Sequence, residues 1–426
     1  MAQRRRVAVV GSGVSGLTAA WLLRHTHDVT VLEVDDRLGG HAHSHDVTAT
    51  DGRTYSVDSG FIVHNDRTYP LLRRLFAALG VQTRPTEMSM SIRCDGCGLE
   101  YAGGRGAAGI VAQPRRLADP RFVRLLSQVR RFQRQAKQFL ASTPERDETT
   151  YRDFLAAGGF GTYFQQHYAV PIVSCVWSSG TGTALDYPAR YLFAFLDQHG
   201  FLTLRDAPQW RTVVGGSQAY VRALAEQIGD VRTGVGARMV TRKPDGVQVL
   251  DSSDRLHVVD QVVLATHADD ALALLTDATD DERRVLGAFG YSANTAVLHT
   301  DASVLPRAPR ARASWNYRLE GCGEHPGSPR VSYWMNRLQG HEDAADTFMV
   351  SLNDDRPDPA TVIAQMTYTH PRYTLASVAA QRELAGLTTT STAFAGAHHG
   401  WGFHEDGCRS GVDAARRLGA AVERAW

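Results

Sequence analysis

The sequence is poor in features that would define several other classes of protein. Its 426 residues carry 46 basic and 45 acidic side chains, so a net charge of +1 gives no electrostatic argument for a nucleic-acid partner. The most apolar stretch, AVPIVSCVW at 169–177, is far shorter than the roughly 18 residues that indicate a membrane-spanning helix. The start, MAQRRR, leads into an apolar run without a cleavage site, so we expect a cytoplasmic protein.

Cysteine is scarce and shows no paired pattern. The five cysteines are odd in number and scattered, which is typical of a reducing compartment. Cys94 and Cys97 form the sequence CDGC, but no second such pair follows, so we expect no zinc and no other bound metal. The intervening Asp95-Gly96 is a hairpin-turn signal, which favours a β-turn with incidental thiols, and a redox dithiol is the alternative.

The first 33 residues, in contrast, carry a strong pattern. Residues 6–16 read RVAVVGSGVSG, and a second apolar run, VTVLE, ends at Glu33. This order predicts a strand, a glycine turn, a helix and a second strand ending in a carboxylate that bonds ribose hydroxyls, as a dinucleotide requires. Gly11 allows the sharp turn, Gly13 lets the backbone approach a pyrophosphate, and Gly16 lets helix and strand pack closely. The helix N-terminus offers N–H groups to the phosphates, and the pattern leaves FAD and NAD as alternatives.

The stretch after Glu33 favours FAD through a family resemblance. It reads VDDRLGGHAHS, and together with the strings VDSGFIVHNDRTYP, LEYAG, ASWNY and GWGFHEDG it resembles the flavin-containing amine-oxidase superfamily. Within the superfamily the strings are similar to those of a set of bacterial flavoproteins, relatives of which accompany, or are fused to, cyclopropane-fatty-acid-synthase-like methyltransferases. The resemblance implies FAD as the cofactor, with His41 standing where many members carry arginine. The glycine pattern and the resemblance together place these residues at the cofactor: Gly11, Gly13, Val14, Ser15, Gly16, Glu33, Val34, Arg37, Gly39, Gly40, His41, Gly60, Phe61, Val235, Ala265, Thr266, Gly396, Gly402, Phe403 and His404.

The order of the segments predicts an α/β protein with a Rossmann-like FAD-binding domain and an interleaved α+β substrate domain. The chain is too long for one compact core, so two domains are expected. We expect the FAD-binding domain over 1–105, 206–284 and 386–426, and the substrate domain over 106–205 and 285–385. Within the latter, the strings TAVLHTD, ASWNYRL, RVSYWMN and TFMVSLN are rich in β-branched and aromatic residues and predict a sheet.

A long amphipathic helix is predicted after residue 119. Asp119 and Pro120 suit its N-cap and first turn, and apolar residues then repeat at helical spacing. The opposite face is basic, with no acid among Arg121, Arg124, Arg130, Arg131, Arg134 and Lys137. Such a face is either solvated or lies on an anionic membrane surface.

Catalytic residues are harder to predict, because a flavin carries out hydride transfer itself. Amine oxidases of the superfamily place a lysine near the flavin on a strand expected here near TAVLHT, but neither of the two lysines, Lys137 and Lys243, falls on it, which argues against amine oxidation. His64 and Tyr317 are the candidate proton acceptors. Covalent attachment of the flavin through His41 is an alternative to non-covalent binding.

These observations predict an FAD-dependent oxidoreductase that abstracts hydride from, or desaturates, an apolar acyl-lipid substrate. A flavin amine oxidase is one alternative. A flavin-binding partner subunit of a lipid methyltransferase is another. The basic helix would allow peripheral contact with the inner membrane face, and a methyltransferase is the expected protein partner.

Overall fold

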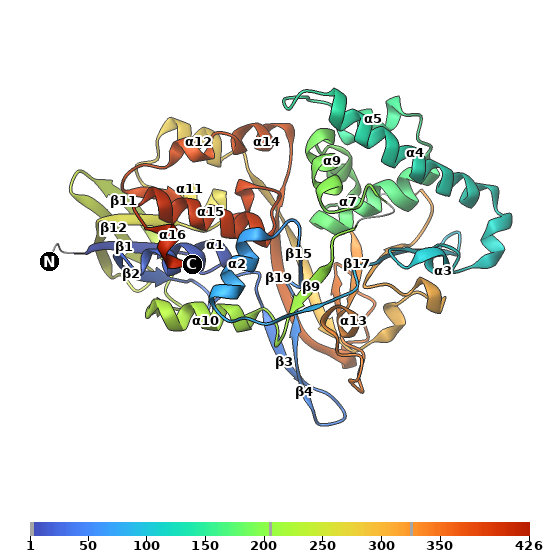
Figure 1. Ribbon diagram of the computed structural model, residues 1–426, viewed down its shortest axis with the longest axis horizontal. Helices are drawn as coiled ribbons and strands as arrows, with labels where there is room; N and C mark the ends of the chain where they lie inside the picture. Colours follow the sequence, from blue (N-terminus) through green and yellow to red (C-terminus); the bar gives the residue numbers. More distant parts are fainter. Residues whose placement is uncertain (1–3, 204–206, 324–326) are drawn as a thin grey trace.

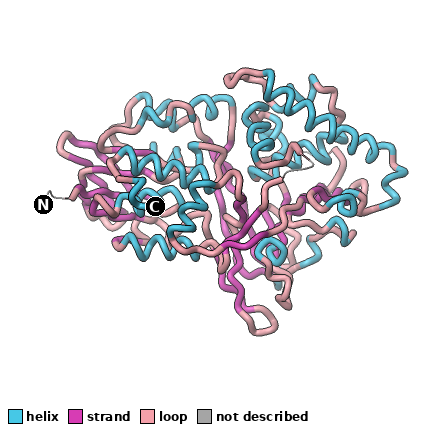
Figure 2. The backbone as a smooth tube through the Cα atoms, viewed as in Figure 1, coloured by secondary structure: helices cyan, strands magenta, loops and turns pink. Residues whose placement is uncertain are grey.

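The computed structural model describes residues 4–203, 207–323 and 327–426, whose elements form two units (Figure 1). The five-stranded unit is built on a parallel sheet and contains both ends of the chain. The seven-stranded unit is built on a mixed sheet with a group of helices beside it. Figure 2 shows strands running through the middle of the molecule and helices on either side of them. The predicted α/β class with an interleaved second unit is confirmed.

The parallel sheet has the strand order β10-β2-β1-β14-β20. Successive side chains of a strand point to opposite faces, so the apolar run at the start of the chain serves two cores. Val7 and Val9 enter one hydrophobic cluster, while Ala8 and Val10 enter another on the opposite face. The strands are β1 (Arg5–Val10), β2 (His27–Leu32), β10 (Asp230–Arg232), β14 (Gln261–Leu264) and β20 (Thr392–Phe394).

Helices α1 (Val14–Leu23) and α15 (His404–Arg417) lie against each other on one face of this sheet. A Cβ atom on Gly411 would lie 2.3 Å from the carbonyl oxygen of Ser15, so only glycine fits at their crossing. The same core is completed by α2 (Pro70–Ala78), α10 (Gln218–Ile228) and α16 (Val422–Ala425). The other face packs against β11 (Ala237–Lys243), β12 (Gly246–Asp251), β13 (Leu256–Val259), α11 (Ala268–Leu274), α12 (Asp280–Leu286) and α14 (Leu375–Gln381).

The second sheet has the order β19-β15-β18-β17-β16-β7-β8 and is antiparallel except between β16 and β7. The four strings predicted to form a substrate-domain sheet all lie in it. Strands β7 and β8, which the sequence grouped with the FAD-binding segment, lie in it too, because β7 pairs with β16 over five residues. The strands are β7 (Met90–Cys94), β8 (Leu99–Gly103), β15 (Gly290–His299), β16 (Trp315–Leu319), β17 (Arg330–Trp334), β18 (Met349–Leu352) and β19 (Val362–Arg372).

A group of helices packs beside this sheet, at the upper right of Figure 1. The longest, α4 (Pro120–Ser142), begins as predicted: the carboxylate of Asp119 accepts the N–H of Arg121. Its apolar stripe is buried, with Phe132 ringed by aromatic side chains from the neighbouring helices. The other helices are α3 (Gly106–Ile110), α5 (Tyr151–Ala157), α6 (Thr162–Phe164), α7 (Val170–Trp177), α8 (Thr181–Leu185) and α9 (Ala189–Gln198).

Short elements join the two units. Strands β3 (Ser44–Thr48) and β4 (Thr54–Asp58) form the hairpin predicted from Asp51-Gly52, where Gly52 has φ +81°. The remaining elements are β5 (Val63–Asn65), β6 (Thr83–Pro85), β9 (Trp210–Val213) and α13 (Met335–Gln339). Among the described residues, no helix combines the length and the apolar character that crossing a membrane requires.

Candidate cofactor and substrate site

A cavity of about 880 Å³ lies between the two units. The five-stranded unit contributes the ends of β1, β2 and β14 and the start of α15. The seven-stranded unit contributes aromatic side chains from α7, α9, β16 and β17. The cavity therefore meets the carboxyl edge of a parallel sheet, which is where such sheets bind ligands.

The glycine turn after β1 has the geometry that the sequence predicted. Gly11 has φ +97°, and a Cβ atom there would lie 2.7 Å from the carbonyl oxygen of Ala265. Gly13 lines the cavity, and a Cβ atom on it would have no neighbouring atom within 4 Å, so its backbone is open to a ligand on that side. Helix α1 begins at the next residue, and its first N–H groups and positive dipole end favour a phosphate there.

Glu33 follows β2 directly and lines the same cavity while remaining buried. One of its carboxylate oxygens accepts hydrogen bonds from the backbone N–H (2.7 Å) and the hydroxyl (2.5 Å) of Ser12. The other accepts the N–H of Asp35 at 3.0 Å. These three bonds fix the carboxylate at the edge of the cavity, where it retains lone pairs for ribose hydroxyls.

The doublet Gly39-Gly40 packs against the first glycine turn. Gly39 has φ +107° and donates its N–H to the carbonyl oxygen of Ser12 (3.1 Å). Gly40 has φ +56° and lines the cavity, and its carbonyl oxygen accepts a hydrogen bond from the Arg37 guanidinium at 2.7 Å. Two successive left-handed residues explain why glycine stands at both positions.

The start of α15 forms a further wall of the cavity. The ring of His404 stacks on that of Phe61 with centroids 3.7 Å apart and an angle of 12°, and its Nε2 lies 3.0 Å from the hydroxyl of Tyr220. Asp406 accepts the N–H of Phe403 at 3.1 Å and so caps the helix. Burial raises the pKa of Glu405 to about 7 and that of Asp406 to about 6.

The cavity brings together most of the residues that the sequence assigned to the cofactor: Gly11, Gly13, Val14, Ser15, Glu33, Val34, Gly40, His41, Gly60, Phe61, Ala265, Thr266, Gly396, Gly402, Phe403 and His404. Gly16, Arg37 and Gly39 lie behind this lining, in packing and hydrogen-bonding positions. Val235 also lies outside it, because its N–H is donated to the carbonyl oxygen of Glu33 at 2.8 Å. The segment Gly236–Arg238 lines the cavity in its place.

The two candidate proton acceptors lie elsewhere. His64 is buried against Phe76 and Tyr69, while its neighbour Val63 lines the cavity, because adjacent side chains of β5 point in opposite directions. Burial lowers the pKa of His64 to about 4. Tyr317 is buried in β16 and faces a separate small cavity beneath α7. Neither side chain is therefore placed to take a proton from a molecule in the large cavity.

Polar groups that the sequence did not single out meet the cavity instead. They include Tyr368 and His370 on β19 and His267 after β14. The rings of His370 and Tyr368 lie 5.3 and 5.2 Å from that of His41. Burial lowers the pKa of all three histidines, which are consequently neutral near pH 7. Tyr368 and His370 are two residues apart on β19, so their side chains lie on the same face of the strand. The sequence could reveal their place at the cavity only if the pairing of β19 were known.

The fit of a dinucleotide can be tested on buried polar atoms that the protein leaves unpaired. Nε2 of His41 is fully buried and has no hydrogen-bond partner among the described residues, although His41 lines the cavity. Nε2 of His398, another residue that lines the cavity, is also buried without a hydrogen-bond partner among the described residues. Buried polar atoms normally have a partner. The open Gly13, the fixed Glu33 and these two nitrogens fit a bound dinucleotide.

The part of the cavity formed by the seven-stranded unit is aromatic. The rings of Trp177 and Phe195 lie 4.7 Å apart, and Phe195 stacks on Phe403 at 4.8 Å. Among the described residues, the charged side chains that line the cavity are Glu33, Arg238 and Asp270, all from the five-stranded unit. A molecule that reaches the aromatic part therefore meets no ionic partner.

Comparison with known proteins agrees with this geometry. The family model for flavin containing amine oxidoreductase matches residues 14–356. The crystal structure of a CLA-producing fatty acid isomerase from P. acnes is similar at 18% identity and a TM-score of 0.68, over 98% of this chain and 100% of that one. Cyclohexylamine oxidase from Brevibacterium oxydans IH-35A is similar at 16% identity and a TM-score of 0.71, over 99% of this chain and 100% of that one. Putrescine oxidase bound to putrescine is similar at 16% identity and a TM-score of 0.69, over 98% of this chain and 99% of that one. At these identities the structures show a shared fold.

Proposed function

Since the chain belongs to the flavin-containing amine oxidoreductase family and is an FAD-dependent oxidoreductase, we propose that it removes hydride from an apolar, acyl-type lipid substrate. FAD supplies the hydride acceptor. In the proposed arrangement Glu33 bonds the ribose, the N-terminus of α1 beside Gly13 holds the pyrophosphate, and the wall around Phe61 and His404 receives the ring system.

The observation that carries the proposal is the uncharged aromatic part of the cavity. An aliphatic chain gains about 0.8 kcal/mol for each methylene group that it buries there. An ammonium ion would lose its hydration without gaining a carboxylate partner from the seven-stranded unit, and an unpaired buried charge is strongly unfavourable. A charged head group is accordingly expected to stay outside, with only the acyl chain inside the cavity.

Tyr368 is the best-placed group for moving a proton. Tyr368 lines the cavity, and its hydroxyl lies 2.6 Å from the hydroxyl of Ser59 and 2.9 Å from Nδ1 of His43. Ser59 in turn lies 2.9 Å from Nε2 of His45. His370, in contrast, is held as a hydrogen-bond donor. Asn294 donates to its Nδ1 (3.0 Å), so the neutral ring carries its hydrogen on Nε2.

Anaerobic reduction of the bound flavin tests the proposal. The purified enzyme is mixed with phospholipids that carry saturated or monounsaturated chains and, separately, with a panel of primary amines, while flavin absorbance is followed. Bleaching by acyl lipids with a change in chain unsaturation supports the proposal. Bleaching by amines alone would make the protein an amine oxidase, which is the second candidate because two of the similar structures are amine oxidases. A flavin that no substrate reduces would favour the role of a methyltransferase partner subunit.

A lipid substrate would also require contact with a membrane surface, and we assign this contact to α4. Arg124, Arg130 and Arg134 are exposed on it, whereas Arg121 and Lys137 pair with Asp119 and Asp197. Two exposed apolar side chains, Leu117 and Val123, lie at the start of the helix. Basic and apolar side chains together suit the interface of an anionic membrane.

A further inference from the structure

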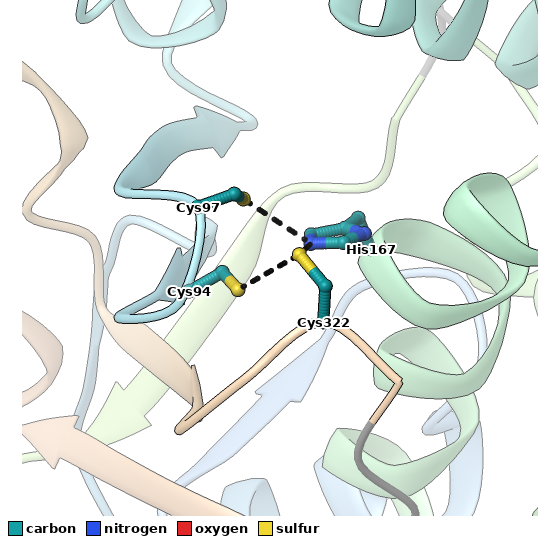
Figure 3. Close-up of side chains that lie close together, drawn as sticks. All are labelled: Cys94, Cys97, His167 and Cys322. Atoms are coloured by element: carbon teal, nitrogen blue, oxygen red, sulfur yellow. Dashed lines mark hydrogen bonds between the residues drawn. The ribbon is translucent and has the colours of Figure 1, made fainter.

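Four potential metal ligands meet at a place that the oxidoreductase chemistry does not use. Cys94 and Cys97 come from the hairpin between β7 and β8, His167 from the helical group, and Cys322 from the loop after β16 (Figure 3). None of the four lines the large cavity. The sequence showed only the CDGC pair, because the other two ligands lie 70 or more positions further along the chain.

Three of the six distances between the four ligand atoms match a single tetrahedral ion, and all four atoms lie within 4.8 Å of one another. The sulfur atoms of Cys94 and Cys322 lie 3.7 Å apart, and Nε2 of His167 lies 3.7 Å from the sulfur of Cys97 and 3.6 Å from that of Cys322. Bond lengths to zinc of about 2.3 Å for sulfur and about 2.05 Å for nitrogen, at tetrahedral angles, require edges of about 3.8 and 3.6 Å. The three edges therefore agree with those of a zinc site.

The ring of His167 is oriented for such a bond. Its Nδ1 lies 2.9 Å from the carbonyl oxygen of Tyr163, which can only accept, so Nδ1 carries the hydrogen and Nε2 presents its lone pair to the three sulfurs. The ring of Tyr163 stacks on it with centroids 4.1 Å apart. A hydrogen bond from the second ring nitrogen to a carbonyl is the usual support for a metal-binding histidine. His167 lies in a π-helical turn, Gln165–Ala169, and such turns occur frequently at functional sites.

The backbone holds the cysteine loops against each other. Cys94 pairs with Leu319 in the parallel register of β7 and β16, and Asp95 donates its N–H to the carbonyl oxygen of the same leucine at 2.8 Å. A Cβ atom on Gly96 would lie 2.9 Å from the Cα atom of Gly321, so the CDGC turn and the loop that carries Cys322 are in close contact. The ligands are therefore positioned by the sheet.

We propose that Cys94, Cys97, His167 and Cys322 bind one structural Zn²⁺ ion. Three cysteines and one histidine form a complete tetrahedral set without an open position, which is typical of structural zinc sites. Binding requires thiolates, so each thiol gives up its proton to solvent when the metal enters, and no oxidant or reductant takes part. The ion joins the β7–β8 hairpin, the β16 loop and the segment that leads into α7, whose C-terminal end lines the cavity.

Two arginines lie near this site, where a bound ion would leave a net negative charge. Three thiolates, a neutral histidine and Zn²⁺ carry a net charge of −1. Arg116 donates a hydrogen bond to the carbonyl oxygen of Cys97, and the guanidinium of Arg121 lies 5.6 Å from the ring centre of Tyr163. Both arginines also pair with the carboxylate of Asp119, so their charge would offset that of the metal site only in part.

Other uses of these cysteines fit the geometry less well. A multi-iron cluster needs its ligands spread around a larger core, whereas all four ligand atoms here lie within 4.8 Å of one another. A disulfide would join two thiols and leave the third, together with the oriented imidazole, without a role. All five cysteines are free in the structure.

Metal content tests the proposal on the full-length flavoprotein. Elemental analysis of protein purified without a chelator is expected to give about one zinc per chain, and X-ray absorption at the zinc edge should show three sulfur neighbours and one nitrogen neighbour. Cys97→Ser and His167→Asn should each lower the zinc content severalfold. Cys408→Ala, which removes a buried cysteine from α15, is the matched control and should retain it.

A second measurement uses only the wild-type protein, so it remains informative if the variants fail to fold. Wild-type protein is titrated with a thiol-modifying mercurial in the presence of a chromogenic zinc chelator, and we expect release of one zinc as three thiols react. The proposal is overturned by metal-free protein that gains no thermal stability from added zinc, or by zinc with a mainly oxygen environment, which indicates an adventitious ion. A disulfide within the cluster in protein purified without oxidant would also overturn it.

Discussion

Ser12 and Glu33 are joined by two hydrogen bonds to one carboxylate oxygen, at 2.7 Å from the backbone nitrogen and 2.5 Å from the hydroxyl of Ser12. The contact ties the glycine turn after β1 to the end of β2. Because the same hydroxyl also lies 3.2 Å from the N–H of Gly39, it links three of the segments that surround the cofactor position. A single serine thus connects the glycine turn, the Glu33 carboxylate and the second glycine pair.

Replacing that carboxylate tests its role directly. Glu33→Gln keeps the shape but removes the charge, and charge-assisted hydrogen bonds contribute about 1.5–3 kcal/mol. We expect the Kd for FAD to rise about tenfold or more when deflavinated protein is titrated with FAD. Asp28→Asn, at an exposed position of the preceding strand β2, is the control and should bind FAD like the wild type. An unchanged Kd for Glu33→Gln would remove Glu33 from the binding site.

The crossing of α1 and α15 predicts a stability effect. In Gly411→Ala the new methyl group would lie 2.3 Å from a backbone oxygen, so the helices must separate, and such overpacking costs about 1–3 kcal/mol. A lower urea midpoint is expected. Gly182→Ala, in α8, adds the same methyl group where no atom lies within 4 Å and should leave stability unchanged or slightly raise it. Equal effects of the two substitutions would contradict the packing explanation.

The buried histidines predict a loss of stability in acid. Burial lowers their folded-state pKa values to about 3 or 4, below the unfolded value near 6.5, so unfolding takes up protons between these limits. Their contribution to stability is complete above pH 6.5 and is lost as the pH falls towards 4. The residues with these shifts are His43, His64, His199, His299, His370, His399 and His404.

Three buried acids change the stability with pH in the direction opposite to that of the histidines. The folded-state pKa values of Asp58, Asp406 and Glu405 are raised by burial to about 6, 6 and 7, so their contribution is present below pH 4 and is lost as the pH rises. His41 and His398, whose pKa values burial lowers well below the usual value, act with the seven histidines, so the histidines outweigh the three acids and unfolding near pH 5 should take up protons net. Urea unfolding between pH 5 and 7 measures this slope, and His299→Gln should reduce it by about one proton. Stability that rises on acidification would contradict the assignment.

The proposed membrane contact of α4 is tested by charge removal. Neutralising Arg124, Arg130 and Arg134 to Gln should weaken binding to vesicles containing phosphatidylglycerol by about tenfold or more, since each basic residue near such a surface contributes about 1 kcal/mol. The matched control neutralises three exposed arginines on other elements, Arg255, Arg310 and Arg417. An equal loss in both triple variants would show that only net charge matters. Cosedimentation at fixed salt is the measurement.

The glycine turn and the carboxylate that line the cavity were predictable because their signals are local. The strand, glycine turn and carboxylate lie within 33 residues, and each step follows from backbone geometry. The orientation of His64 was not predictable. Successive side chains of a strand point to opposite faces, so a shift of one residue decides whether a side chain faces the cavity or the core. The place of β7 in the second sheet and the cysteine–histidine cluster depend on pairing between segments more than 200 residues apart, which no local pattern encodes.

The central claim is that one FAD lies along the cavity with its pyrophosphate at Gly13, and substitution of this glycine tests it most directly. A Cβ atom on Gly13 would meet no protein atom within 4 Å, and the residue lines the cavity, so a longer side chain there would extend into the space proposed for the pyrophosphate. Wild-type protein should carry about one FAD per chain. Gly13→Leu should carry none, while its circular dichroism and unfolding match those of deflavinated wild type. A Gly13→Leu protein that purifies with a full complement of FAD, or a wild-type protein that stays colourless after incubation with FAD, would contradict the account.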